Sequence, residues 1–167
     1  SGDVLINGIN LRTLKDNRVP HLRRQLGVVF QDFKLLPRLT VYENVAFAME
    51  VIEEQPKVIR KRVMEVLELV GLKHKVRMLP TELSGGEQQR VAIARAISTN
   101  VEVIVADEPT GNLDGKTSET IIELFKELAH QRDKCVIMVT HSEKIAEQSD
   151  VILKLNTDTQ NFEIKTN

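Results

Sequence analysis

The chain has 167 residues, of which 41% are hydrophobic and 28% charged, and its formal net charge is −1. This length is enough for a domain with a hydrophobic core, and the charge balance excludes the broad basic field that nucleic-acid binding requires. The single cysteine, Cys135, excludes a disulfide framework and fits a reducing compartment. No apolar run approaches the length of a membrane span. The composition therefore predicts an ordinary α/β domain without a nucleic-acid partner.

The first part of the chain shows the pattern of a short hairpin followed by a buried strand. Two apolar stretches, residues 4–6 and 9–11, flank an Asn-Gly pair, a composition that joins antiparallel strands. A further apolar run over residues 26–30 predicts a buried strand that ends at Gln31.

The next segment has helical periodicity. Thr40 is a suitable cap for a helix over residues 41–51, and apolar residues recur at helical spacing over residues 57–70. We therefore expect residues 32–79 to form a mainly helical subdomain.

Strand and helix patterns alternate in the remaining sequence. A Ser-Gly-Gly turn precedes a predicted helix over residues 87–97, and the apolar run 101–106 suits a central parallel strand covered on both faces. The polar tail from Asn156 is not assigned to an element. The other predicted elements are helices over residues 117–129 and 143–148 and strands over residues 135–140 and 151–155.

This alternation predicts an α/β fold with a mostly parallel sheet. The partial core of that fold is expected to comprise residues 1–31 and 80–167, interrupted by the helical subdomain over residues 32–79. The loop after Gln31 begins this subdomain, and the helix that follows Ser84 is expected to pack on it.

The most specific motif is Leu-Ser-Gly-Gly-Glu-Gln-Gln-Arg at residues 83–90. Two glycines let the backbone approach a ligand closely, and a helix that begins there presents unpaired N–H groups and the positive end of its dipole. The hydroxyl of Ser84 adds a donor. The motif therefore predicts a site for a terminal phosphate, although a serine cap after a glycine turn is also common in purely structural helices.

Two carboxylates, Asp107 and Glu108, follow a buried strand at the edge where α/β sheets usually bind ligands. Asp107 suits a Mg²⁺ shell and Glu108 suits a general base that polarises a water. A solvated Asp-Glu pair is the structural alternative. Gln31 and His141 follow two other predicted strands, so parallel topology is expected to bring all four side chains to one edge.

Taken in chain order, these motifs resemble those of the ABC transporter ATP-binding domains over nearly the whole chain. The resemblance implies a P-loop NTPase (RecA-like) core with an inserted helical subdomain, and ATP and Mg²⁺ as cofactors. It implies catalytic roles for Glu108 and His141 and metal binding by Asp107 and Gln31. The residues that it implies for nucleotide binding are Gln31, Ser84, Gly85, Gly86, Glu87, Gln88 and Asp114.

Two subfamilies share parts of this pattern. Residues 27–37 and 40–45 resemble the cell-division ATP-binding proteins of the FtsE type, whereas residues 139–142 and 149–153 look more like the ATPases of lipoprotein release and macrolide export. The phosphate-loop pattern G-x-x-x-x-G-K-[ST] does not occur in these residues. The resemblance places that loop before Ser1, so we expect an N-terminally truncated core that is inactive alone.

The resemblance implies an ATPase subunit that couples hydrolysis to a membrane permease, FtsX-like or of the exporter type. It implies an ATP-dependent homodimer, located in the cytoplasm on the inner face of the membrane. An inert fragment and a non-transport soluble ABC ATPase are the alternatives. A permease helix is expected to bind an apolar segment that follows Gln31. The alternative is that this segment packs internally. Its apolar residues are Phe33, Leu35, Leu36, Leu39, Tyr42 and Val45.

Overall fold

The computed structural model describes residues 3–156 and 161–167. The strands are β1 (Leu5–Ile6), β2 (Ile9–Asn10), β3 (Leu26–Val29), β4 (Val103–Asp107), β5 (Cys135–Val139), β6 (Val151–Asn156) and β7 (Asn161–Thr166). The α-helices are α1 (Val19–Arg23), α2 (Val41–Glu50), α3 (Pro56–Leu69), α4 (Gly85–Ser98), α5 (Gly115–His130) and α6 (Glu143–Ala146). Short 3₁₀ turns cover Leu11–Thr13, Asp16–Arg18, Lys73–Lys75 and Pro80–Glu82.

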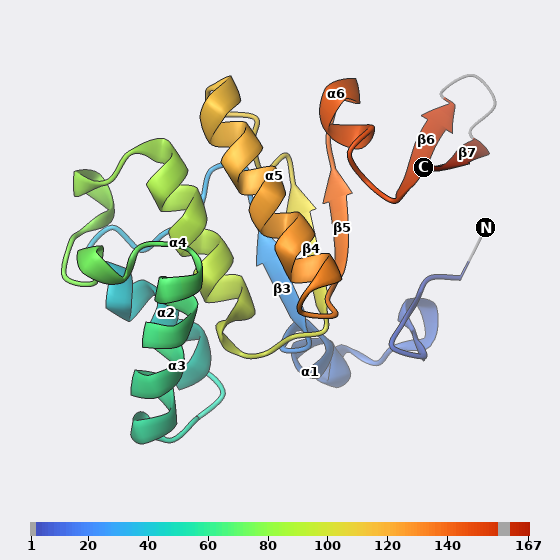
Figure 1. Cartoon of the computed structure of the whole chain (residues 1–167). Coiled ribbons are helices and arrows are strands. Elements are labelled where there is room, and N and C mark those ends of the chain that lie inside the picture. Colours follow the sequence, from blue (N-terminus) through green and yellow to red (C-terminus); the bar gives the residue numbers. More distant parts are fainter. Residues whose placement is uncertain (1–2, 157–160) are drawn as a thin grey trace.

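Strands β3, β4 and β5 form a parallel sheet in that order (Figure 1). The register aligns Val29 with Ala106, and Ala106 with Met138. All three strands therefore end at one edge of the sheet. The expectation of a mostly parallel sheet in an α/β fold is confirmed for this central layer.

Helices α4 and α5 lie on the same side of this sheet (Figure 1). They cover the face that carries Val29, Ile104 and Ala106, which are fully buried. Gly27 on β3 faces α4 so closely that a Cβ atom there would lie 2.7 Å from the carbonyl oxygen of Ala96. The absence of a side chain at Gly27 allows this close helix–strand packing.

The opposite face of the sheet is open among the described residues. On β5, Ile137 is 50% exposed and Val139 53% exposed, and Val28 on β3 is also exposed. The expectation that β4 is covered on both faces is not met among the described residues, because α4 and α5 both pack on one side of the sheet. Periodicity could not reveal this, since an apolar run is compatible with either arrangement.

Two antiparallel hairpins lie outside the parallel sheet. β1 pairs with β2 around the Asn-Gly turn, as the sequence predicts. β6 pairs with β7, and Leu153 lies opposite Ile164. Strand β7 was not predicted, because its alternation of apolar and charged residues is weak evidence without a known pairing partner.

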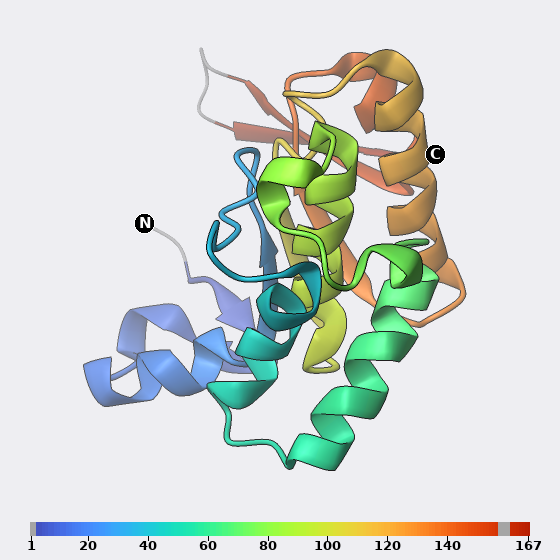
Figure 2. The same cartoon turned by 90° about the vertical axis from the view of Figure 1, so that its left-hand side faces the viewer.

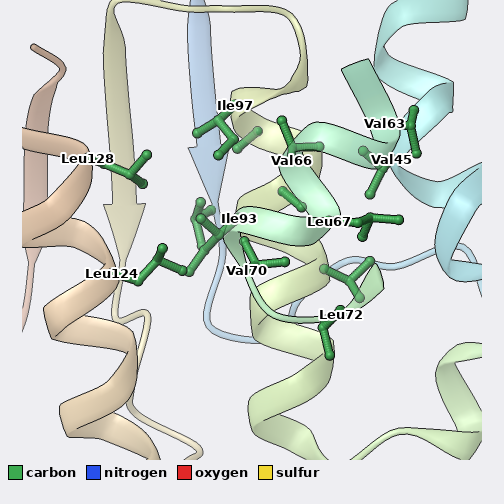
Figure 3. Close-up of a cluster of buried hydrophobic side chains, with 14 of the residues drawn as sticks. Val45, Val63, Val66, Leu67, Val70, Leu72, Ile93, Ile97, Leu124 and Leu128 are labelled. Atoms are coloured by element: carbon green, nitrogen blue, oxygen red, sulfur yellow. The ribbon is translucent and has the colours of Figure 1, made fainter. Parts of the chain in front are cut away.

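Helices α2 and α3 pack against α4 (Figure 2), and Figure 1 shows them on the side of α4 away from α5. Buried aliphatic side chains from these four helices form one continuous cluster (Figure 3). Helix α4 therefore sits at the centre of the molecule and is fixed by both the sheet and the helical segment. Among the described residues, no helix combines the length and the apolar character that a membrane span requires.

Candidate functional site

Asp107 is the last residue of β4, and Glu108 follows it in the left-handed backbone conformation with φ +44°. The amide of Glu108 donates to the carbonyl oxygen of Val139 on the neighbouring strand (2.9 Å). Its carboxylate accepts hydrogen bonds from the backbone N–H of His141 (2.6 Å) and from the hydroxyl of Thr140 (3.4 Å). The Glu108 carboxylate is thus held in one orientation by groups that follow β5.

The imidazole of His141 is almost fully exposed, and its Nε2 lies 3.9 Å from Oε1 of Glu108. The predicted meeting of Glu108 and His141 is therefore observed, but the shorter contact comes from the backbone of His141. The exposed ring is free to contact a group outside this chain.

Gln31 follows β3 by two residues and is joined to the loop after Glu108. Its side-chain N–H donates to Oδ1 of Asn112 (3.3 Å), and the side-chain amide of Asn112 donates to the Gln31 carbonyl oxygen (3.1 Å). Among the described residues the side-chain oxygen of Gln31 has no hydrogen-bond partner, so it is available as a ligand. We call the group at the ends of the three parallel strands the strand-end cluster: Gln31, Asp107, Glu108, Asn112, Thr140 and His141.

A second group forms around the start of α4. Ser84 caps this helix, since its hydroxyl accepts from the amide of Glu87 (3.4 Å) and the Glu87 carboxylate accepts from the Ser84 amide (2.9 Å). The amides of Gly85 and Gly86 have no hydrogen-bond partner among the described residues. Gly85 is half-buried and Gly86 is buried, so two backbone donors without a partner lie at the positive end of the helix dipole, an arrangement that favours an anion.

The side chains of Glu87 and Gln88 point back to the protein. Lys75 donates to the Glu87 carboxylate (2.5 Å), and this bond together with the Ser84 amide lowers the pKa of Glu87 to about 2. Gln88 donates its side-chain N–H to the carbonyl oxygen of Leu83 (3.2 Å). Both residues shape the turn that presents Gly85 and Gly86, rather than aiming their own polar groups outward.

The starts of α4 and α5 are in contact through Gly86. A Cβ atom at Gly86 would lie only 2.2 Å from Cγ2 of Thr117, so only glycine fits there. The hydroxyl and amide of Thr117 in turn donate to the carboxylate of Asp114, which caps α5. These two bonds lower the pKa of Asp114. We call Ser84, Gly85, Gly86, Asp114 and Thr117 the helix-start cluster.

The predicted site residues therefore fall into two groups. Gly85 also lies near Leu113 and Phe33, which flank the loops of the strand-end cluster. Within the described part of the chain, no hydrogen bond or ion pair joins Ser84 directly to Glu108. Each group presents its polar atoms separately.

The described residues contain no set of three or more His, Cys, Asp or Glu side chains arranged to hold a metal ion. Asp107 and the free oxygen of Gln31 nevertheless match the oxygen ligands that Mg²⁺ takes when nucleotide phosphates complete its shell. The residues present thus fit a metal that arrives with its nucleotide.

Sequence reasoning assigned no role to several contributors, Thr117 among them. Asn112 fixes Gln31, the hydroxyl of Thr140 holds Glu108, and Lys75 neutralises Glu87. Thr140 had a signal, because it ends a predicted strand beside the strand of Glu108. Nothing in the sequence indicated the pairing of Lys75, because it depends on how a distant turn packs.

The apolar segment after Gln31 is mostly internal. Val45 is fully buried, and Leu35 and Tyr42 pack against the core. The buried amide of Asn44 donates to the carbonyl oxygens of Leu36, Leu39 and Thr40, and so ties this loop to α2. Half-buried surface remains on Phe33, Leu36 and Leu39.

Residues 1–111 match the family model described as "ABC transporter". The chain is 59% identical over 144 residues to the cell division ATP-binding protein FtsE of Bacillus subtilis, covering 86% of this chain and 63% of that protein. It is 50% identical over 147 residues to FtsE of Mycobacterium tuberculosis, covering 88% of this chain and 64% of the relative. The chain therefore spans less than two thirds of these relatives.

Among solved structures, the dimeric post-hydrolysis state of the ATP-binding cassette MJ0796 bound to ADP and Pi superposes with a TM-score of 0.84 at 37% identity. That alignment covers 99% of this chain and 73% of the other. The matched fold, the order of the motifs and the family model agree, and the chain belongs to the ABC transporter family of ATP-binding domains.

Proposed function

We propose that this chain is part of an ATP-hydrolysing subunit of an ABC transporter-type complex, which couples hydrolysis to a membrane permease in transport or in an FtsE-like cell-division role. The observation that carries this proposal is the Glu108 carboxylate, held at the end of β4 by the His141 amide at 2.6 Å. A fixed carboxylate beside Asp107 is what a general base for water requires.

In this proposal Glu108 accepts a proton from the water that attacks the terminal phosphate. The Thr140 hydroxyl and the His141 amide keep the carboxylate aimed while that proton is transferred. The imidazole of His141 is exposed and takes no part in the hydrogen bonds that hold the Glu108 carboxylate, so it is placed to contact the same phosphate. Because positioning and electrostatics dominate phosphoryl transfer, loss of this geometry would affect rate more than binding.

Asp107 and Gln31 would hold Mg²⁺ through their side-chain oxygens, together with the phosphates of ATP. Bound there, the ion neutralises negative charge on those phosphates. Asn112 supports this arrangement, because it engages the nitrogen of the Gln31 side chain and leaves the oxygen outward. The separation into a strand-end and a helix-start cluster fits a protein in which the two clusters contact two different ATP molecules.

The helix-start cluster is proposed to bind the terminal phosphate of an ATP held by a second subunit. Gly85 and Gly86 would donate their free amides and Ser84 its hydroxyl. Glu87, Gln88 and Asp114 maintain the turn through their own bonds. A dimer is supported by the related cassette, whose structure is dimeric and bound to ADP and Pi.

We also propose that residues 32–79 act as a helical subdomain that contacts the permease, with residues 1–31 and 80–167 as the ATPase core. The half-buried side chains of Phe33, Leu36 and Leu39 are the proposed contact, which would place the protein in the cytoplasm at the inner membrane face. Polar substitutions at Phe33 and Leu36 should abolish co-purification of an FtsX-like or exporter-type permease while the protein still folds. Unchanged co-purification would exclude this contact.

The direct test of hydrolysis is Glu108→Gln in the full-length gene product. We expect the turnover rate to fall by about 10²–10⁴-fold while ATP affinity stays nearly unchanged, because the substitution keeps the shape and removes the base. Glu123→Gln, at an exposed position of α5, is the matched control. A Glu108→Gln protein that hydrolyses ATP at the wild-type rate would contradict the assignment of Glu108 as the general base. In a separate test, co-purification with nucleic acid rather than with a permease would favour the non-transport alternative.

A further inference from the structure

Gln89 is a fully buried polar residue in the second turn of α4. Its side-chain Nε2 donates to the carbonyl oxygen of Pro109 at 2.6 Å. Its Oε1 is the one buried side-chain oxygen or nitrogen, in the part of the chain that the structure describes, without a hydrogen-bond partner. The residue therefore makes one short bond across 20 positions and leaves the other half of its amide unpaired.

Packing alone does not explain a glutamine at this position. The buried neighbours along α4 include Val91, Ala92 and Ile93, which are apolar. An apolar side chain of the same length would fill the space without burying an unpaired acceptor, which is unfavourable. What the amide provides that such a side chain cannot is the bond to Pro109.

Pro109 belongs to the turn that sets the direction of Glu108. The amide of Glu108 is held by the carbonyl oxygen of Val139, and its carbonyl oxygen accepts from the amide of Gly111 at 3.0 Å. The bond from Gln89 fixes the next carbonyl in the chain. A glutamate with positive φ is strained, and such a conformation persists when the surrounding bonds over-determine it.

The same helix connects this turn to the helix-start cluster. Ser84 caps α4 and Gln89 lies five residues later, a rise of about 7.5 Å along one hydrogen-bonded helix. A displacement of the capped end is therefore transmitted to the Pro109 carbonyl. In the described residues, no hydrogen bond joins Ser84 of the helix-start cluster directly to Glu108 of the strand-end cluster. The side chain of Gln89 links the two clusters instead.

We propose that Gln89 is a positioning residue that fixes the backbone turn after Glu108 and so ties the orientation of the Glu108 carboxylate to the position of α4. The inference rests on the proposed function and adds a regulatory link to it. Phosphate bound at the start of α4 then adjusts the general base of the same subunit, which itself serves a different ATP.

The first test is Gln89→Met in the full-length gene product, because methionine keeps the length and removes the donor. We expect kcat for ATP hydrolysis to fall between about 10- and 100-fold, as for a small misplacement of a catalytic group. KM for ATP should change less than about twofold, since the loss concerns only the transition state. The melting temperature should change little, because the unpaired acceptor of Gln89 is removed while the Pro109 carbonyl oxygen loses its donor.

The second test is Gln89→Glu, which restores the donor only when its carboxyl group is protonated. Burial raises the pKa of a carboxyl group, so the protonated form persists toward neutral pH. The ratio of kcat for Gln89→Glu to kcat for Gln89→Met should therefore be above one near pH 6 and should decline as pH rises to about 9. A purely structural role would not produce this pH-dependent rescue.

Ser98→Ala is the matched control, because Ser98 is also buried on α4 but its hydroxyl donates to the Arg95 carbonyl oxygen of the same helix end. We expect its kcat to equal that of wild type. A Gln89→Met protein with wild-type kcat, or one in which kcat and melting temperature fall together without pH-dependent rescue, would overturn the inference alone. A wild-type protein without hydrolysis, or a Glu108→Gln protein at the wild-type rate, would instead overturn the proposed function.

Discussion

Helices α2 and α4 begin with the same local arrangement. Thr40 caps α2 and Ser84 caps α4, and in each case a glutamate three residues later accepts from the amide of the capping residue. The bonds from the glutamate amides to the cap hydroxyls are 3.3 Å in α2 and 3.4 Å in α4. By local chemistry alone the two helix starts are nearly equivalent.

They differ in what happens to the next two backbone amides. In α2, Val41 donates to the carbonyl oxygen of Met78 (2.8 Å) and Tyr42 to that of Val76 (3.0 Å). In α4, Gly85 and Gly86 have no partner in the described chain. A capping box therefore does not mark a binding site. The distinction arises because a distant loop satisfies the amides of one helix start and, among the described residues, leaves those of the other without a partner.

The largest expected effect comes from blocking the open helix start. Ser84→Arg adds bulk and removes a donor where we propose that the phosphate sits, so ATP-dependent dimers should be lost and hydrolysis should fall by at least about 10²-fold. Thr40→Arg, at the covered helix start, should lower the stability of the protein but leave ATP-dependent dimer formation and the hydrolysis rate unchanged. Size-exclusion chromatography with light scattering measures the dimer. Dimers that form normally with Ser84→Arg would show that the two helix starts are functionally alike.

An intermediate effect is expected from Gly86→Ala. The new methyl group would meet Cγ2 of Thr117, and overpacking of this kind costs about 1–3 kcal/mol of unfolding free energy. Thr117→Ser removes that methyl group and keeps the hydroxyl bond to Asp114, so the double variant should recover most of the loss. The free energies are measured by urea denaturation. If Gly86→Ala lowered the unfolding free energy by the same amount in the Thr117→Ser background as in the wild type, this contact would be contradicted.

The smallest effect concerns the two capping glutamates. The pKa of Glu43 is lowered by Thr40, and that of Glu87 is lowered to about 2 by Lys75 and the Ser84 amide. Because the folded pKa lies below the ordinary value of 4.5, Glu87 contributes stability above pH 4.5 that is lost as pH falls toward about 2. Lys75→Met should raise this pKa and flatten that part of the stability profile.

The pKa values of the two carboxyl groups are measured by carbon NMR in the wild-type protein and in Lys75→Met. The titration of Glu43 should be unchanged by Lys75→Met, since the ammonium group of Lys75 bonds to Glu87 and, among the described residues, neither to Glu43 nor to Thr40. A wild-type Glu87 that titrates near 4.5 would contradict the ion pair.

Much of this site was predictable from sequence because its motifs are local. Ser84 and Glu87 form a capping box within four residues, and Asp107 with Glu108 follow an apolar run that can only be a buried element. Parallel topology then predicts that Gln31 and His141 reach the same edge. The interactions of Lys75, Asn112 and Gln89 were not predictable, because each joins segments whose approach depends on packing.

The sequence by itself determined the order of elements, the α/β class and the residues that carry the proposed chemistry, since these follow from periodicity and short-range bonding. Only the tertiary structure decided that β7 pairs with β6 and, within the described residues, that one face of the parallel sheet is uncovered and that two amides at the α4 start lack the partners that the α2 start has. The physical reason is the same in each case. Local hydrogen bonds and amphipathic spacing choose an element, but the side of a sheet that a helix covers, or the amide that a loop satisfies, depends on contacts between residues far apart in the chain.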